Sequence, residues 1–223
     1  MHKIITTTDK SNTLYSEKFN EHYHSTFGAI NESSHIFINE GLLYSKLKNV
    51  RIFEVGFGTG LNAFLTYIFC QKHNISVNYT CIEKHPIEIQ IADKLNYPEL
   101  ISPENKNIFN LFHSCKWEEN IIINKSFNFK KVLKDFTKYN FSEKYDIIYF
   151  DAFAPEKQPE LWSFEIFKKI YDALNNRGIL TTYSSKGIVK NNLREAGFTV
   201  KRLKGPEGKR HILRAEKIED NKI

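Results

Sequence analysis

Three glycines at alternate positions mark the segment with the strongest chemical content. Gly56, Gly58 and Gly60 stand in the run EVGFGTGLN at residues 54–62, between a strand-like segment and a helix-like one. Glycines let the backbone turn sharply and approach a ligand where a Cβ atom would collide. The GxGxG spacing matches neither the GxGxxG dinucleotide fingerprint nor a phosphate loop that ends in GKS or GKT. The loop therefore predicts a ligand without a pyrophosphate, with S-adenosyl-L-methionine as the obvious candidate; the alternative is a turn that binds nothing.

Acidic residues follow the next two predicted strands. Glu83 ends the strand expected at residues 77–83, and an acidic residue there can accept hydrogen bonds from both ribose hydroxyls. Asp135 follows the strand expected at residues 129–133, where a carboxylate can accept from an adenine amino group. Both carboxylates suit a cofactor that contains a nucleoside. The alternative for each is an ordinary surface residue.

A third carboxylate stands in the segment DAFAP at residues 151–155. It belongs to Asp151, which follows the run at residues 145–150, a strand apolar enough to be buried on both faces. This position places Asp151 at the carboxyl end of the sheet, near where the sulfonium of a methyl donor would lie. There the carboxylate can orient an amine and help to remove its proton. The alternative is a helix cap or a turn residue.

Basic residues gather near the end of the chain. Lysine and arginine occupy six of the fourteen positions in segment 201–214, including Lys209 and Arg210. Such a strip can form a phosphate-binding face, or it can protect solvated edge strands by its charge. The net charge of +6 allows a polyanionic partner without requiring one.

Metal and membrane sites are not expected. His22, His24 and His35 lie near one another in the sequence, but no cysteine or carboxylate cluster completes a ligand set, so a place in the cleft lining is favoured. The three cysteines are odd in number and widely spaced, which points to a reducing, cytoplasmic environment. No apolar run approaches the ~18–20 residues that a spanning helix needs.

The hydrophobic pattern alternates between strands and helices from residue 50 onward. Strands are expected at seven places, which are residues 50–55, 77–83, 129–133, 145–150, 179–183, 198–203 and 211–213. Helices between them make βαβ units, which predict an α/β fold with a mostly parallel seven-stranded sheet and helices on both faces. Ser163 and Gly178 are expected to bound one of these helices.

One domain with a preceding arm accounts for the length of 223 residues. Residues 1–49 form an N-terminal arm that is expected to pack on the cleft, and residues 50–215 form the main domain. Trp117 and the neighbouring isoleucines predict a small helical insertion near residues 96–128, either as surface packing or as a lid that faces the substrate. Residues 216–223 are a polar tail.

Several of these segments together resemble the tRNA 5-aminomethyl-2-thiouridine methyltransferases. The most specific is DAFAPEKQPELW at residues 151–162, whereas the glycine loop is general to class I methyltransferases. Further matching segments are Tyr23-His24-Ser25 with Gly28-Ala29, Glu32 and Gly41-Leu42, TYSSKG at 182–187, REAGF at 194–198, and Gly205-Pro206 with Gly208-Lys209-Arg210. The resemblance covers about residues 13–214 and implies a Rossmann-like class I fold.

The resemblance implies an S-adenosyl-L-methionine-dependent enzyme that methylates the wobble uridine in the anticodon of certain tRNAs. The reaction converts a 5-aminomethyl group into 5-methylaminomethyl by direct attack of the neutral amine on the sulfonium methyl. Some family members carry this domain fused to a flavin oxidase that makes the amine. The sequence shows no second glycine-rich nucleotide motif, so that oxidase domain is expected to be absent.

Each candidate residue then has an expected role. Asp151 is the catalytic residue, which orients the amine and accepts its proton. The residues expected to contact the cofactor are Glu54, Gly56, Gly58, Gly60, Glu83 and Asp135. The residues expected to contact the substrate are Tyr23, His24, Phe153, Lys186, Lys209 and Arg210.

Two other functions share part of this pattern. A class I methyltransferase that acts on a small-molecule or protein amine would need the glycine loop, Glu83 and Asp151, but no basic strip. A non-catalytic tRNA-binding protein on the same fold would keep the basic strip and should lose the glycines or the carboxylates, both of which are intact here. The GxGxG spacing disfavours an NAD-dependent oxidoreductase.

Overall fold

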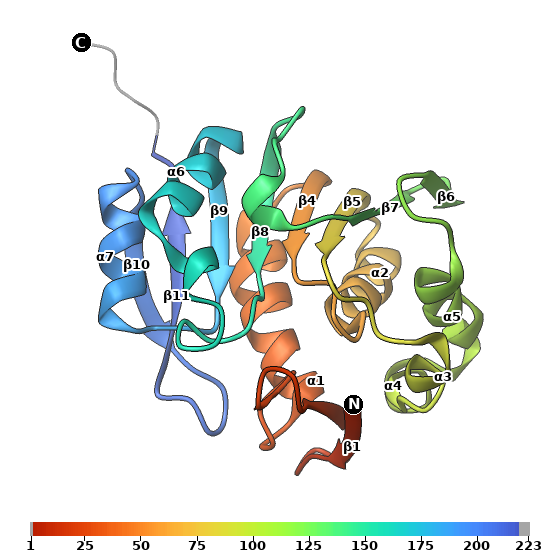
Figure 1. The fold of residues 1–223 in the computed structure, drawn as a ribbon. Coiled ribbons are helices and arrows are strands. Elements are labelled where there is room, and N and C mark those ends of the chain that lie inside the picture. Colours follow the sequence, from red (N-terminus) through yellow and green to blue (C-terminus); the bar gives the residue numbers. More distant parts are fainter. Residues whose placement is uncertain (1, 219–223) are drawn as a thin grey trace.

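An eight-stranded mixed sheet forms the centre of the molecule. The computed structural model describes residues 2–218 of the chain. The strands of the sheet, in its spatial order, are β10 (Thr199–Lys204), β11 (His211–Glu216), β9 (Leu174–Thr182), β8 (Tyr145–Phe150), β4 (Asn49–Val55), β5 (Ser76–Glu83), β7 (Phe127–Leu133) and β6 (Asn120–Asn124). Figure 1 shows this order across the page, from the blue edge to the green one.

The five inner strands from β9 to β7 run parallel to one another. Strand β11 pairs antiparallel with β9, and edge strand β10 pairs antiparallel with β11. The apolar run at residues 145–150 is the middle of this arrangement, and Ile147, Ile148, Tyr149 and Phe150 are all fully buried. The expected α/β architecture and its parallel core are therefore confirmed.

The expectation of seven strands is wrong by one strand. The isoleucines that predicted a helical insertion lie in β6, which pairs antiparallel with β7 and extends the sheet. The residues before them are helical, as α4 (Tyr97–Ile101), a short 3₁₀ turn at Pro103–Asn105 and α5 (Lys106–Ser114). The reason is that consecutive β-branched residues favour an extended backbone, and the exposed edge of β7 offers them a pairing partner.

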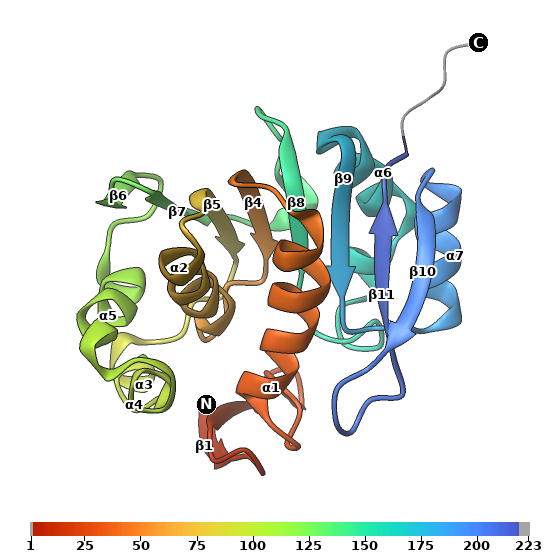
Figure 2. The same ribbon diagram turned by 180° about the vertical axis from the view of Figure 1, so that it is seen from behind.

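Helices cover the two faces of the sheet with separate cores. On one face lie α1 (Ala29–Ser33), the π-helix that follows it (Ser34–Leu43), α2 (Leu61–His73) and α5, as Figure 2 shows. On the other face lie α6 (Phe164–Ala173) and α7 (Gly187–Glu195). Alternate side chains of β4 enter the two cores, because Ile52 packs with the first set of helices and Phe53 with the second.

Of the two predicted boundaries of helix α6, the structure confirms the first and not the second. Ser163 accepts a hydrogen bond from the backbone N–H of Ile166, so the expected N-terminal cap is confirmed. The expectation that Gly178 closes the helix is wrong, since α6 ends at Ala173 and Gly178 lies within β9. The pairing of β9 with β8 shifts its register between Leu174 and Ile179, and this irregularity takes up the intervening residues.

Residues 2–22, the first part of the predicted arm at 1–49, form a small antiparallel sheet of their own, whereas α1 and the π-helix pack on the main sheet; the arm below means the part before α1. The strands of the small sheet are β1 (His2–Thr6), β2 (Asn12–Ser16) and β3 (Glu21–His22). Figure 1 shows this small sheet at the lower end of the molecule. The arm is fastened to the main domain, because the backbone N–H of Asn12 donates to Asn96 Oδ1 at 2.8 Å and the backbone N–H of Ala154 donates to Glu21 Oε2 at 3.0 Å.

The remaining elements are short and lie in the connections. They are α3 (Ile89–Ala92) and two 3₁₀ turns at Phe136–Lys138 and Pro159–Trp162. Of the predicted polar tail at 216–223, Glu216 ends β11, and residues 219–223 lie outside the described residues.

Replacing Phe129 of β7 by alanine should lower the free energy of unfolding by roughly 3–5 kcal/mol, because it removes a fully buried ring from the core. The centroid of this ring lies 4.4 Å from that of Phe112 in α5. Ile122→Ala in the adjacent strand is the control, since the Ile122 side chain is 73% exposed and its loss should cost less than about 0.5 kcal/mol. Urea denaturation measures both variants, and equal effects would show that β7 does not join α5 to the core.

Candidate active site

A cavity of about 370 Å³ lies where the loops after β4, β5, β7 and β8 meet the N-terminal arm. The predicted site residues that line it are Tyr23, His24, Gly56, Gly58, Glu83, Asp135, Asp151, Phe153 and Lys209. The predicted residues outside its lining are Glu54, Gly60, Lys186 and Arg210. Parallel strands place their carboxyl ends at one edge of a sheet, so segments far apart in sequence converge here.

The glycine loop turns tightly against the loop that follows β8. Gly56 has φ +91°, and a Cβ atom built on it would lie 2.4 Å from the carbonyl oxygen of Asp151. Only a residue without a side chain fits this close approach. The next glycine, Gly58, donates its backbone N–H to Glu83 Oε2 at 3.1 Å. The loop therefore joins the ends of β4, β5 and β8 in one rigid unit.

Glu83 is held by backbone donors on both of its oxygens. Its Oε1 accepts hydrogen bonds of 2.8 Å from the backbone N–H groups of Lys84 and His85, while Oε2 accepts the one from Gly58. The carboxylate is thus fixed at the wall of the cavity, in an orientation set by three N–H groups.

Asp135 lies at the far end of the same wall. Lys84 Nζ lies 2.7 Å from Asp135 Oδ2, and Oδ1 accepts from the backbone and hydroxyl of Thr137. These bonds, first that of Lys84, lower the pKa of Asp135 to about 2. The carboxylate is ionised at neutral pH.

Asp151 shares one amide group with a second carboxyl group. Asn62, in the first turn of α2, donates from Nδ2 to Asp151 Oδ2 at 2.8 Å and to Glu54 Oε1 at 2.9 Å. The hydroxyl of Tyr79 donates to the other oxygen of Glu54 at 2.9 Å. Glu54 therefore lies beneath the cavity, where it supports Asn62, and Asp151 lines the cavity itself.

Both carboxyl groups resist ionisation because they lie in a poorly solvated place. The pKa of Asp151 is raised to about 7. Desolvation is the largest cause and the nearby carboxylate of Glu32 adds to it, whereas Asn62 and Lys209 act to lower the pKa. Burial raises the pKa of Glu54 well above its usual range. Asp151 can therefore exchange a proton near neutral pH, while burial favours the protonated form of Glu54 more strongly.

Aromatic rings form the arm side of the cavity. The ring of Phe153 stacks on Phe19 at 4.3 Å between centroids and meets the edge of Tyr23 at 5.0 Å. His24 lies beside them, with its Nδ1 3.1 Å from the hydroxyl oxygen of Thr13. Burial lowers the pKa of His24 to about 4, so its ring is neutral at pH 7.

Among the cavity residues that were not predicted from the sequence as site residues, three bear directly on the surroundings of Asp151. Asn62, Glu32 and Tyr183 all line the cavity. Each stands in a segment that carries the family resemblance or beside the glycine loop, so the signal was present, but nothing in the sequence shows that α1 and the end of β9 approach Asp151. Glu32 pairs with Lys209, whose Nζ lies 3.1 Å from its Oε1.

The structure places the other three predicted residues outside the cavity lining, at a helix start, in an ion pair and on the surface. Gly60 has φ +73° and precedes the first residue of α2, and Lys186 forms an ion pair with Glu156. Arg210 is exposed beyond the cavity.

Within residues 2–218, no group of three or more His, Cys, Asp or Glu side chains is arranged to hold a metal ion. Over the same residues, no helix has the length and apolar character to cross a membrane.

Replacing Asn62 by leucine should raise the pKa of Asp151 above its value of about 7, because the ionised carboxylate loses its donor. The folded protein should lose roughly 1–3 kcal/mol of stability at pH 8. The loss should be smaller at pH 5, where Asp151 is protonated. Carboxyl ¹³C NMR titration and urea unfolding at the two pH values measure this.

Thr66→Val is the matched control for Asn62→Leu. It removes a buried hydrogen bond of 2.7 Å to the backbone oxygen of Asn62 but leaves the side-chain amide in place. The pKa of Asp151 should stay where it is in this variant. An unchanged pKa in Asn62→Leu would mean that the amide does not govern the ionisation of Asp151.

Sequence comparison relates this chain to methyltransferases and to proteins of tRNA modification. A family model described as S-adenosyl-L-methionine-dependent methyltransferase matches residues 110–218. The tRNA 5-methylaminomethyl-2-thiouridine biosynthesis bifunctional protein MnmC of Campylobacter fetus is 31% identical over 218 residues, which are 93% of this chain and 35% of that protein. The chain spans about a third of the length of the curated relatives it matches.

Solved structures show the same relationship. The crystal structure of MnmC2 from Aquifex aeolicus superposes with a TM-score of 0.77 at 28% identity, over 96% of this chain and 70% of that one. Spermidine synthase from Thermotoga maritima shares the fold, with a TM-score of 0.60 at 13% identity over 93% of this chain and 69% of that one. The chain therefore matches an S-adenosyl-L-methionine-dependent methyltransferase model over residues 110–218, and over nearly its whole length it is similar to MnmC2 and to the matching third of the MnmC proteins.

Proposed function

We propose that this protein transfers a methyl group from S-adenosyl-L-methionine to the 5-aminomethyl group of the wobble uridine in tRNA, which gives 5-methylaminomethyl-2-thiouridine. The observation that carries the proposal is the position of Asp151, a carboxyl group with a pKa of about 7 beside the glycine loop. The names of the related proteins supply the substrate class.

The residues of this chain fit the cofactor. Gly56 lets the loop approach the backbone of Asp151, and Gly58 leaves room for the Tyr23 ring at the cavity wall. Glu83 presents a carboxylate fixed by three backbone N–H groups, and its Oε2 has acceptor capacity left for a ribose hydroxyl. Asp135 is ionised and can accept from an adenine amino group. When bound, the cofactor supplies the methyl group on a positively charged sulfur. Glu54 and Gly60 serve this site indirectly, by supporting Asn62 and by starting α2.

Asp151 handles the proton of the amine. An alkylammonium has no lone pair with which to attack, so one proton must leave before the C–N bond forms. Asp151 accepts that proton from the substrate nitrogen, and Asn62 holds the carboxylate so that one oxygen faces the cavity. A base with a pKa near the working pH suits such a transfer.

The aromatic wall suits an unstacked base. Bases of single-stranded RNA are commonly recognised by stacking on aromatic side chains. Phe153, Phe19 and Tyr23 line the cavity together, and Trp162 fixes the loop of Phe153 by donating its indole N–H to the Phe153 carbonyl oxygen at 2.8 Å. We assign the wobble uridine ring to this wall, with its aminomethyl group directed at Asp151.

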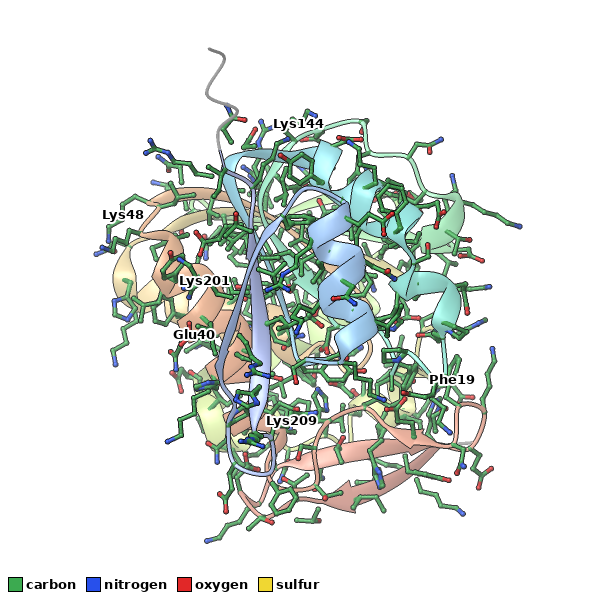
Figure 3. All side chains as sticks on the ribbon, turned by 90° about the vertical axis from the view of Figure 1, so that its left-hand side faces the viewer. Phe19, Glu40, Lys48, Lys144, Lys201 and Lys209 are labelled. Carbon is green, nitrogen blue, oxygen red and sulfur yellow. The ribbon has the colours of Figure 1, made fainter. Side chains whose placement is uncertain are left out.

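A basic edge of the sheet suits the phosphates of the tRNA. Strand β10 carries exposed Lys201, Arg202 and Lys204, and the loop that follows it carries Arg210. Figure 3 shows Lys201 along this edge and Lys209 at its lower end, above the N-terminal arm. The edge therefore leads from the outer surface to the cavity. A methyltransferase for a small amine would need no such path.

Asp151→Asn should reduce the rate of methyl transfer to aminomethyl-tRNA by roughly 10²-fold or more, the scale for losing a positioned acid–base group. In the wild-type protein, kcat/KM should rise with pH through about 7, because only ionised Asp151 accepts the proton. The variant should lose this rise. Labelled S-adenosyl-L-methionine followed by nucleoside analysis measures the product.

Glu156→Gln is the control for Asp151→Asn, because it removes an exposed carboxylate from the same loop. The affinity for S-adenosylhomocysteine, measured by calorimetry, should be nearly equal in all three proteins. Normal turnover in Asp151→Asn, or a defect explained wholly by lost cofactor binding, would contradict the proposed mechanism. Methylation of a small amine or protein in preference to tRNA would contradict the proposed substrate.

Replacing Lys204 and Arg210 together by alanine should weaken tRNA binding and reduce its dependence on salt concentration, because fewer counterions are released when fewer phosphates are contacted. Two lost contacts should lower the slope of log Kd against log salt by about 1–2 units. Lys48 and Lys144 are exposed, do not line the cavity and lie at the opposite end of the molecule from Lys209 in Figure 3, so they provide the matched double-alanine control. Equal slopes in both double variants would leave the edge without a role in binding.

A further inference from the structure

We propose that Glu32 and the ring of Tyr183 form a subsite for the alkylammonium group of the substrate, and that Lys209 occupies this subsite until the substrate displaces it. The inference rests on the proposed function and deepens it. It assigns the Lys209 ammonium as the stand-in for the ammonium of the substrate.

Glu32 is a carboxylate placed to receive a cation. Only 6% of its surface is exposed, and it lines the cavity. Its Oε2 accepts a hydrogen bond of 2.6 Å from the backbone N–H of Ser25, and its Oε1 lies 3.1 Å from Lys209 Nζ. Because α1 and the arm fix one oxygen, the other is directed at a single position in the cavity, and a cation is there.

Tyr183 completes the surroundings expected of a cation site. Lys209 Nζ lies 4.5 Å from the centroid of its ring, within the range of a cation–π contact. The Tyr183 hydroxyl donates to the carbonyl oxygen of Ala152 at 2.9 Å, which fixes the ring beside the backbone of the catalytic loop. A carboxylate and an aromatic face together form a general recognition site for an ammonium group.

The carboxyl groups on this side of the cavity favour a cation at the position of Lys209 Nζ. Three carboxyl groups from separate elements line it, those of Glu21, Glu32 and Asp151. The ammonium of Lys209 acts against the raised pKa of both Glu21 and Asp151, so it interacts electrostatically with these carboxyl groups as well as with Glu32. Removing Lys209 without a replacement would leave Glu32 buried and unpaired, which is costly. A substrate ammonium at the same position pairs with Glu32 in place of Lys209.

The two partners differ in their freedom to move. Glu32 lies on a helix and is held by a backbone donor, whereas Lys209 lies in the loop between β10 and β11 and its side chain is 27% exposed. Lys209 is also continuous with the basic edge in Figure 3. A tRNA phosphate arriving at that edge can take Lys209 out of the cavity, which frees Glu32 for the amine. Lys209 thus exchanges Glu32 for a phosphate when Glu32 exchanges Lys209 for the amine, which couples the two binding events.

The test compares two tRNAs that differ only in the aminomethyl group. Their Kd values are measured with saturating S-adenosylhomocysteine, so that no turnover occurs and contacts to phosphates cancel in the ratio. Glu32→Gln should reduce the preference for aminomethyl-tRNA by ~10-fold or more, the scale of a lost charged hydrogen bond. Lys209→Met should increase the preference by about threefold or more, because the internal competitor is gone.

The opposite directions separate this subsite from a purely structural ion pair. If the pair only held the loop in place, both variants would reduce the preference alike or leave it unchanged, and either result would overturn the inference. Glu207→Gln, an exposed carboxylate of the same loop, and Lys204→Met, which should weaken both tRNAs equally, are the controls. The double variant Glu32→Gln/Lys209→Met leaves no unpaired charge and checks for folding defects.

Failure of the proposed function would look different. Wild-type protein that binds neither tRNA, or that transfers no methyl group to aminomethyl-tRNA, would contradict the proposed function itself. Wild-type protein that methylates aminomethyl-tRNA but binds both tRNAs equally well would contradict the ammonium subsite alone.

Discussion

The shared amide of Asn62 is the contact on which the site depends. It joins a carboxyl group from the end of β4 to one from the end of β8, through the first turn of α2. Two carboxyl groups this close, with Glu54 buried and Asp151 partly open to the cavity, would repel each other if both were ionised. Because burial raises the pKa of Glu54 well above its usual range and Asn62 donates to both, Asp151 is the better placed of the two for the proposed proton exchange. The packing of α2 on the sheet therefore determines the chemistry at its edge.

The arm converts this edge into an enclosed cavity. Without it, Asp151 would face solvent, and the desolvation that raises its pKa to about 7 would be reduced. Glu21 accepts from the backbone of Ala154, so the arm also holds the catalytic loop. The arm contributes Tyr23 and His24 to the same wall. The proposed recognition of the substrate and the raised pKa of Asp151 thus both depend on one docking contact.

Local patterns predicted what depends on local physics. The glycine loop, Glu83 and Asp151 follow from strand ends and close backbone approach, and the structure brings them together. The eighth strand and the place of Gly178 were missed, since both depend on which partner a neighbouring strand offers. Glu32 and Tyr183 were missed as site residues for a related reason: the sequence gives no distance between α1, β9 and the loop that carries Lys209.

The raised pKa of Asp151 also has a cost in stability. A carboxyl group with a folded pKa of about 7 binds its proton more tightly in the folded protein than in the unfolded chain, where an unperturbed aspartate has a pKa of 3.8. Stability from this group is therefore fully present below pH 3.8 and is lost as the pH rises towards 7. Asp151 thus ionises in the pH range where doing so destabilises the fold. If the proposed substrate binds here, its ammonium offsets that cost, so the charge of the substrate and the ionisation of Asp151 favour each other.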